Sequence, residues 1–180
     1  STANYFPTRE SLLEAIVDDP DARAAGLPIL TEPERDRLLR EWNHTESPYP
    51  RVGLHELFAR QAAESPTAIA VQSGDAQLTY AELDARANQL AHHLQGLGVG
   101  PEVLVGICLE RSERMVVGLL GILKAGGGYV PIDPTYPAER QAFMLESSQA
   151  PVILTEARLR SSLPPGDATV VGIDDDWDAI

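Results

Sequence analysis

Three consecutive glycines at 126–128 follow a strongly apolar stretch and fix the point at which a helix has to end. Each glycine costs a helix roughly 0.5 to 1 kcal/mol relative to alanine, and glycine readily adopts the left-handed conformation that terminates helices. The apolar residues upstream cover most of a helix circumference, which predicts a largely buried helix from a cap at Ser112 to Ala125. Residues 129–132 then predict a short strand, with Pro131 near its exit or on a sheet edge because proline cannot donate to a ladder.

Helical and strand-like segments alternate from residue 53 onward. The clearest helix is predicted over 79–97, because Thr79 and Glu82 have capping-box spacing and Gly98 follows the last apolar residue. The run 103–109 is apolar throughout, as in a strand that is buried on both faces. We predict helices over 54–63, 79–97, 112–125, 138–147 and 156–163, and strands over 68–72, 77–78, 103–109, 129–132, 151–154 and 169–173. This alternation predicts an α/β fold with a largely parallel, doubly wound sheet flanked by helices.

The first 52 residues predict a smaller piece with little core of its own. Ser11 is expected to cap a short first helix. Thr31 and Glu34 have capping-box spacing ahead of a second helix over 33–42, whose apolar residues form one narrow stripe. Residues 43–52 contain two prolines among polar residues, which is typical of a connector. Helices this short are marginal alone, so we expect the piece to lie on a neighbouring domain.

Charge and composition disfavour several partners. Aspartate and glutamate number 27 against 14 lysines and arginines, giving a net charge of −13 that opposes nucleic acid and anionic membrane surfaces. No apolar run reaches the roughly 18 residues that a membrane-spanning helix needs, and no signal-peptide pattern is present. The one cysteine, Cys108, lies in an apolar run and is expected to be an inert core thiol. We therefore expect a cytoplasmic protein that binds neither nucleic acid nor membranes.

The glycines and histidines do not predict a binding site. The glycines at 126–128 follow a helix and open a strand, whereas a phosphate-binding loop follows a strand and opens a helix. His92 and His93 are adjacent on a predicted helix, so their side chains diverge and do not have metal-ligand spacing. Both histidines are expected to be solvated or half-buried helix residues.

The charged residues give no stronger signal. Lys124 is expected to be a helix-end charge, and Glu139 with Arg140 a surface pair. The aspartates at 174–176 and 178 suggest a cation site, but without convergent ligands elsewhere we interpret them as a solvated acidic turn. The residues alone therefore assign no catalytic, cofactor-binding or metal-binding side chain.

Two stretches nevertheless form a recognisable pair. Leu-Thr-Tyr-Ala-Glu-Leu at 78–83 with Arg-Ala-Asn-Gln-Leu-Ala at 86–91, followed by residues 123–140, closely resemble the first two core motifs of nonribosomal peptide synthetase adenylation domains. Upstream, residues 12–21 and 27–32 look like the tail of a condensation domain and the linker behind it. The resemblance covers nearly the whole chain, and its two core motifs are specific as a pair.

The resemblance implies a domain organisation. Residues 1–30 would be a condensation-domain tail, 31–52 an interdomain linker with a short helix, and 53–180 the N-terminal part of an adenylation domain. Because the chain begins without methionine and stops after an acidic run, we expect it to be a truncated piece. The partners implied are the remaining condensation, adenylation and carrier domains of the parent synthetase.

The resemblance also implies an activity for the parent. Its adenylation domain would use ATP and Mg²⁺ to form an aminoacyl adenylate and would load the amino acid onto a carrier-protein phosphopantetheine. The phosphate loop, pocket residues, ribose-binding aspartate and catalytic lysine of that family would all lie beyond Ile180. The resemblance therefore gives this chain no catalytic, cofactor-binding or metal-binding residue and no cofactor of its own, and we expect it to be inactive alone.

Two other hypotheses remain open. A non-catalytic interdomain or docking scaffold would use the condensation-like helices to hold the α/β unit for assembly. A piece of an acyl- or aryl-CoA ligase is less favoured, because such relatives would not carry the condensation-like tail.

Overall fold

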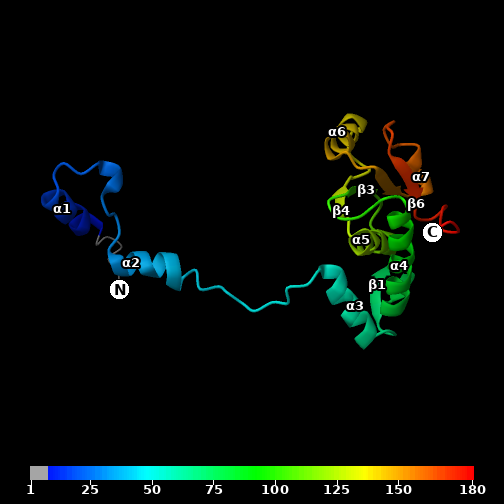
Figure 1. The fold of residues 1–180 in the computed structure, drawn as a ribbon, viewed down its shortest axis with the longest axis horizontal. Coiled ribbons are helices and arrows are strands. Elements are labelled where there is room, and N and C mark those ends of the chain that lie inside the picture. Colours follow the sequence, from blue (N-terminus) through cyan, green and yellow to red (C-terminus); the bar gives the residue numbers. More distant parts are fainter. Residues whose placement is uncertain (1–7) are drawn as a thin grey trace. The chain divides into compact units, whose positions relative to one another are not determined.

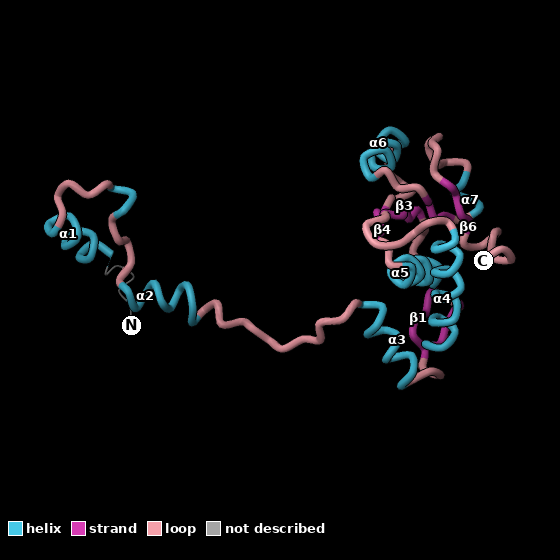
Figure 2. The backbone as a smooth tube through the Cα atoms, viewed as in Figure 1, coloured by secondary structure: helices cyan, strands magenta, loops and turns pink. Residues whose placement is uncertain are grey.

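The structure is a computed structural model that describes residues 8–180, and these fall into two units. One unit ends at Arg51, and the other runs from Val52 to Ile180. Residues 44–53 carry no helix or strand (Figure 2). Because each unit has its own internal contacts, the two are described separately.

The described part of the first unit is helical. Its elements are α1 (Thr8–Asp18), the 3₁₀ turn η1 (Ala24–Gly26), α2 (Glu32–Asp36) and the π-helical turn η2 (Arg37–Glu41). No residue from 11 to 51 is buried, which agrees with the expectation of an amphipathic piece that needs a neighbour.

The helix starts in this unit were predicted with mixed success. The capping box forms as expected: the backbone N–H of Thr31 donates to Glu34 Oε2 at 2.9 Å. The predicted cap at Ser11 is wrong, because α1 begins at Thr8 and Ser11 lies inside it. The helix predicted over 33–42 is present, but its second half has π-helical hydrogen bonding.

The second unit combines a parallel sheet, a hairpin and five helices among its described residues (Figure 1). Its elements are α3 (Leu54–Glu64), β1 (Ile69–Ser73), β2 (Ala76–Thr79), α4 (Tyr80–Gly96), β3 (Leu104–Cys108), α5 (Glu113–Ala125), β4 (Gly128–Pro131), α6 (Ala138–Ser148), β5 (Val152–Thr155), α7 (Ala157–Arg160) and β6 (Thr169–Gly172). β1 and β2 pair antiparallel, and the other four strands form a parallel sheet in the order β4-β3-β5-β6. The predicted α/β class with a largely parallel sheet is confirmed. The last helix ends at Arg160, three residues short of the predicted 163.

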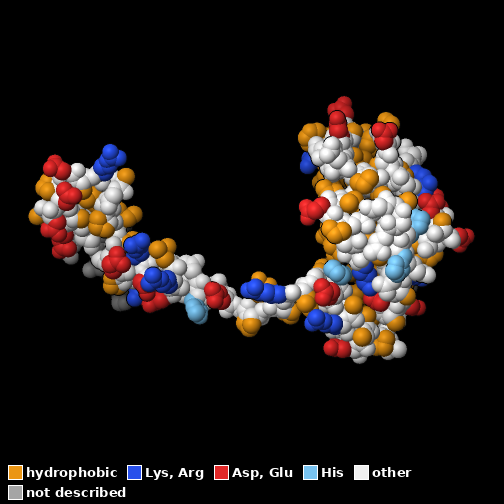
Figure 3. Space-filling model, in the orientation of Figure 1, with side chains coloured by type: hydrophobic (Ala, Val, Ile, Leu, Met, Phe, Trp, Pro, Cys, Tyr) orange, Lys and Arg blue, Asp and Glu red, His pale blue; other side chains and the backbone are white. Residues whose placement is uncertain are grey.

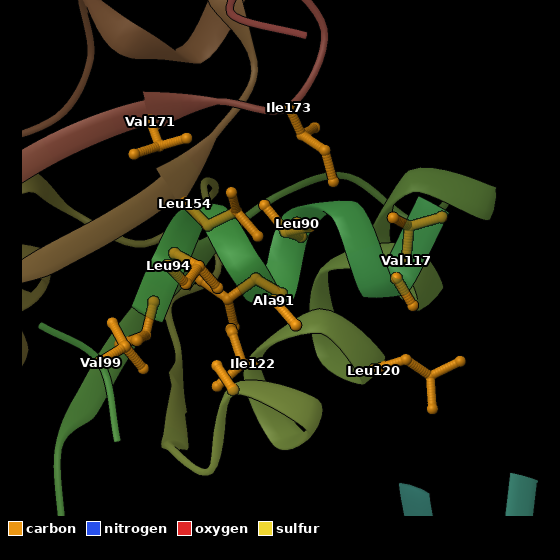
Figure 4. Close-up of a cluster of buried hydrophobic side chains, with 14 of the residues drawn as sticks. Leu90, Ala91, Leu94, Val99, Val117, Leu120, Ile122, Leu154, Val171 and Ile173 are labelled. Carbon is orange, nitrogen blue, oxygen red and sulfur yellow. The ribbon is translucent and has the colours of Figure 1, made fainter. Parts of the chain in front are cut away.

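One face of the sheet carries the main core. In Figure 4, side chains of α4 and α5 converge with those of β5 and β6. The labelled members are Leu90, Ala91, Leu94, Val99, Val117, Leu120, Ile122, Leu154, Val171 and Ile173. Gly106, on the alternate face of β3, lies so that an added Cβ would meet Leu145 of α6 at 3.1 Å. Because successive strand residues point to opposite faces, α6 covers the face opposite to α5.

The capping box of α4 and the glycine end of α5 form as predicted, whereas the predicted side-chain cap of α5 at Ser112 does not. The Thr79 hydroxyl accepts from the N–H of Glu82 at 3.3 Å, and the N–H of Thr79 donates to Glu82 Oε2 at 2.8 Å. Gly126 closes α5 with a left-handed φ of 91°. Ser112 occupies the cap position of α5, but its hydroxyl donates to the carbonyl of Glu110 instead.

The glycine segment leads directly into an edge strand. Gly127 is buried, and a Cβ there would lie 2.7 Å from Val99, so the close approach itself requires glycine. β4 is the outer strand of the sheet, and Pro131 is its last residue. Both positions that the sequence allowed for this proline, the strand exit and the sheet edge, are therefore realised together.

Candidate functional site

The carboxyl edge of the parallel sheet is where this topology places a ligand site. β3 lies between β4 and β5 in the sheet. The crossover from β3 therefore leads to β4 on one side of β3, and the next crossover leads from β4 to β5 on the other side of β3. In open α/β sheets such a switch point opens a crevice beyond the carboxyl ends of the strands. Here it lies where β3 ends at Cys108 and β5 ends at Thr155. The Thr155 hydroxyl donates to the carbonyl of Cys108 at 3.0 Å and ties the two strand ends together.

Two glutamates and one arginine bridge this crevice. Arg158 Nη2 lies 2.6 Å from Glu110 Oε2, beyond β3, and its Nε lies 2.9 Å from Glu156 Oε2, beyond β5. The Glu156 side chain is only 4% exposed, so Arg158 is its charged partner in a nearly water-free position. Hydrogen bonds first to Glu110 and then to Glu156 raise the pKa of Arg158. The triad links the residues that follow β3 and β5, with both Arg158 and Glu110 about half exposed to solvent.

Of the aspartates predicted to form a solvated acidic turn, Asp175 and Asp178 are exposed, whereas Asp174 and Asp176 are half-buried and hydrogen-bonded to the backbone. Asp176 Oδ2 accepts from the N–H of Gly172 at 2.8 Å and from Arg160 Nη2 at 2.6 Å. These two bonds, the backbone one first, lower the pKa of Asp176. Asp174 accepts the N–H of Ala157 at 2.9 Å. The carboxylates are thus used internally, and no group of three or more metal-ligating side chains occurs among the residues described.

Lys124 is not merely a helix-end charge. Its Nζ lies 2.6 Å from Asp84 Oδ1 and 2.6 Å from Asn88 Oδ1, which joins α5 to α4. The Nζ also lies 5.9 Å from the centre of the Phe58 ring of α3. Only 11% of the lysine side chain is exposed. This cluster fastens three helices together and is structural.

The histidines, the cysteine and the Glu139–Arg140 pair do not come together in one site. His92 is exposed and His93 half-buried, as expected for neighbours on a helix. Cys108 is buried, and burial raises the pKa of its thiol, which agrees with an inert core residue. The predicted surface pair Glu139–Arg140 does not form: the Arg140 guanidinium instead stacks 4.4 Å from the centre of the Tyr136 ring.

The surface carries no broad basic field on the side that Figure 3 shows. There the Lys and Arg side chains of the second unit are scattered among acidic ones. No helix in the described part of the chain is both long enough and apolar enough to cross a bilayer.

Sequence reasoning missed the triad at the strand ends, although part of the signal was present. Glu110 and Glu156 each follow a buried strand, and parallel strands place their carboxyl ends at one edge. The two carboxylates could therefore have been brought together from the sequence. The bridging Arg158 could not, because an exposed helical arginine has several reachable partners.

The second unit has a parallel sheet with helices on both faces and a topological switch point at its carboxyl edge. This arrangement is typical of nucleotide-associated α/β folds. Its glycine segment ends α5 and opens β4. That order, helix then strand, is the reverse of the strand-then-helix order of a phosphate-binding loop.

The chain belongs to the AMP-binding enzyme family, whose family model matches residues 58–178. It is 51% identical over 178 residues to a linear gramicidin synthase of Brevibacillus parabrevis, covering 98% of this chain and 2% of that protein. It is 49% identical over 168 residues to chondramide synthase cmdD of Chondromyces crocatus, covering 91% of this chain and 4% of that protein. The resemblance to nonribosomal peptide synthetases is thereby confirmed, and the chain spans only a few per cent of these relatives.

Solved structures support the same assignment. The nonribosomal peptide synthetase FmoA3 superposes with a TM-score of 0.81 at 35% identity, covering 94% of this chain and 19% of that one. A form of FmoA3 with α-methyl-L-serine-AMP bound has a TM-score of 0.82 at 34% identity, covering 99% of this chain and 22% of that one. A third form carries AMPPNP. The fold therefore matches the adenylation region of a synthetase.

Proposed function

We propose that this chain is part of a synthetase module that activates an amino acid. The module's adenylation domain would convert the amino acid and ATP, with Mg²⁺, to an aminoacyl adenylate. It would then transfer the aminoacyl group to the phosphopantetheine thiol of a carrier domain. The observation that carries the proposal is the 51% identity to a linear gramicidin synthase across 178 residues, together with the AMP-binding match at 58–178.

The proposed domain organisation follows the same match. Residues 1–30 would belong to the end of a condensation domain, 31–52 to the interdomain linker, and 53–180 to the adenylation domain. The partners would be the other condensation, adenylation and carrier domains of the parent, and the location would be cytoplasmic. Within the adenylation domain these residues would build the sheet. The 180-residue chain itself should give no amino-acid-dependent ATP–pyrophosphate exchange.

A chimera tests the proposal directly. Residues 52–180 would replace the matching segment of a linear gramicidin synthase adenylation domain, and amino-acid-dependent ATP–pyrophosphate exchange would be measured. We expect exchange to be retained with the recipient's amino-acid preference. A matched chimera carrying Gly121→Ala, which overpacks α4 against α5, should lose stability and exchange together. A folded chimera that binds AMPPNP but supports no exchange would refute the assignment.

The exposed apolar residues of the first unit favour the docking scaffold as a second function. Leu39 of η2 is 62% exposed, and Trp42, the residue that follows η2, is 67% exposed. Two large apolar side chains exposed close together on one segment offer a contact for a partner domain. The chain should then retain a condensation domain in a pull-down, and a Leu39→Ser, Trp42→Ser variant should not. Equal retention by both proteins would exclude this role.

A further inference from the structure

A hollow of about 740 Å³ lies beside the switch-point triad, beyond the ends of β3 and β4. Its floor is apolar: Ile107, Leu109 and Ile132 are buried, and Met115 and Met144 are half-buried. The two methionines come from α5 and α6, which cover opposite faces of the sheet. Thioether side chains adapt readily to the shape of an apolar or aromatic group.

The segment that forms one wall of this hollow is held rigidly. Asp133 Oδ1 accepts both the N–H of Thr135 at 2.9 Å and its hydroxyl at 2.7 Å. The buried amide of Gln141 donates to the carbonyl of Tyr136 at 2.8 Å and spans toward that of Pro134 at 3.4 Å. A connection between a strand and a helix does not need this many internal bonds. The bonds fix the backbone on which Tyr136 sits, and the Tyr136 ring is in contact with the Arg140 guanidinium, 4.4 Å from the ring centre.

The charged side chains at the rim of the hollow differ in whether they have a partner among the described residues. Glu110 is paired with Arg158, and Asp133 accepts two bonds from Thr135. Those two bonds, with a smaller contribution from the charge of Arg111, lower the pKa of Asp133. Arg111 itself, like Arg140, forms no ion pair within the part of the chain that the structure describes.

Two exposed guanidinium groups at the mouth of an apolar hollow therefore have no ion-pair partner among the described residues, in a protein with a net charge of −13. Arg140 is already oriented by its stacking on Tyr136. A planar guanidinium in such a position is suited to a carboxylate or phosphate oxygen pair.

We propose that this hollow is a ligand site for a molecule that joins an anionic group, a carboxylate or a phosphate, to a flat apolar body. Arg111 and Arg140 bind the anion, Tyr136 stacks against the body, and Met115 and Met144 contact its far side. The proposal does not depend on the proposed amino-acid activation. It concerns residues that the resemblance leaves without a binding role.

Titration of the 180-residue chain with three small probes tests the site by NMR. The probes are benzoate, phenyl phosphate and the neutral benzamide, and the readout is the Nε–Hε signals of the arginines. We expect saturable shifts of Arg111 and Arg140 with one or both anions and none with benzamide. Stronger binding of phenyl phosphate identifies the anion as a phosphate, and stronger binding of benzoate identifies it as a carboxylate.

Matched variants separate a built site from general charge attraction. The double variant Arg111→Gln, Arg140→Gln should weaken anion binding about tenfold, because each exposed charge-assisted contact contributes only a few-fold. Arg60→Gln removes an exposed arginine of α3 that forms no ion pair among the described residues, and it should leave binding unchanged. Equal weakening by both variants, or benzamide binding as tightly as the anions, would overturn the proposal. Thermal unfolding of each variant confirms that the fold is intact.

Discussion

The Lys124 cluster offers the sharpest test of how this fold is held together. Lys124→Met keeps the length and the apolar stem of the side chain but removes the charge that joins α5 to α4. Asp84 would then keep only the amide of Asn88, whose Nδ2 lies 3.0 Å from Asp84 Oδ2, and partial access to water. The variant therefore isolates the electrostatic part of the contact.

The expected loss can be worked from the structure. Breaking a fully buried ion pair costs about 3 to 5 kcal/mol, because the remaining charge is left without a partner. Lys124 is 11% exposed and Asp84 is 27% exposed, so water compensates part of that loss. The contact with the Phe58 ring adds about 0.5 to 1 kcal/mol. We expect the free energy of unfolding to fall by about 2 kcal/mol.

Urea unfolding followed by far-UV circular dichroism measures this loss, with an unchanged slope against denaturant as the check on two-state behaviour. Asp84→Asn should cost a similar amount, and the double variant should be less destabilised than the sum by about 1 kcal/mol or more. Arg60→Met is the control and should change stability by less than about 0.5 kcal/mol. Strict additivity of the two cluster substitutions would refute the reasoning.

Three further predictions concern local packing and titration. Gly121→Ala should destabilise by about 1 to 3 kcal/mol, because its Cβ would lie 2.6 Å from a leucine of α4, whereas Gly96→Ala, in open space, should stabilise slightly in the same urea assay. Bonds from the N–H and then the hydroxyl of Thr79 lower the pKa of Glu82 below its ordinary 4.5. The contribution of ionised Glu82 to the stability of the fold is therefore complete above pH 4.5, and it is lost as the pH falls through the lowered pKa. Thr79→Ala removes the hydroxyl bond but keeps the backbone one, so the pKa of Glu82 should move part of the way back toward 4.5 in a side-chain NMR titration, and an unmoved pKa would contradict the hydroxyl contact. Burial raises the pKa of the Cys108 thiol, so iodoacetamide should label it only after unfolding; rapid labelling of the native chain would count against a core thiol.

The elements predicted well are those whose signals are local. Thr79 and Glu82 are three residues apart, and Gly126 follows its helix directly, so backbone chemistry within one turn decides both ends. Ser11 and Ser112 show the limit of such signals. The Ser112 hydroxyl donates to a nearby carbonyl and does not cap its helix. Ser11 cannot be a cap, because α1 already begins at Thr8.

The contacts that the sequence could not reveal join residues that are far apart along the chain. The contact from Lys124 to Asp84 spans 40 positions, and nothing near either residue specifies the other. The same holds for the bridge from Arg158 to Glu110 across the strand ends. Arg140 was assigned to its neighbour in sequence, whereas in the fold it lies against an aromatic face. These side chains find their partners only after the helices and strands have packed.

The proline that closes β4 also determines how that border of the sheet can behave. The N–H groups of Gly128 and Ile132 point inward to the carbonyls of Val103 and Ile107, at 2.9 Å each. By alternation, the outward positions are Tyr129 and Pro131, and proline has no N–H to offer. A strand of another molecule would find a single N–H donor at this edge of β4, that of Tyr129, which is too few for stable strand pairing. Polymerisation through this side is therefore disfavoured by the covalent structure itself.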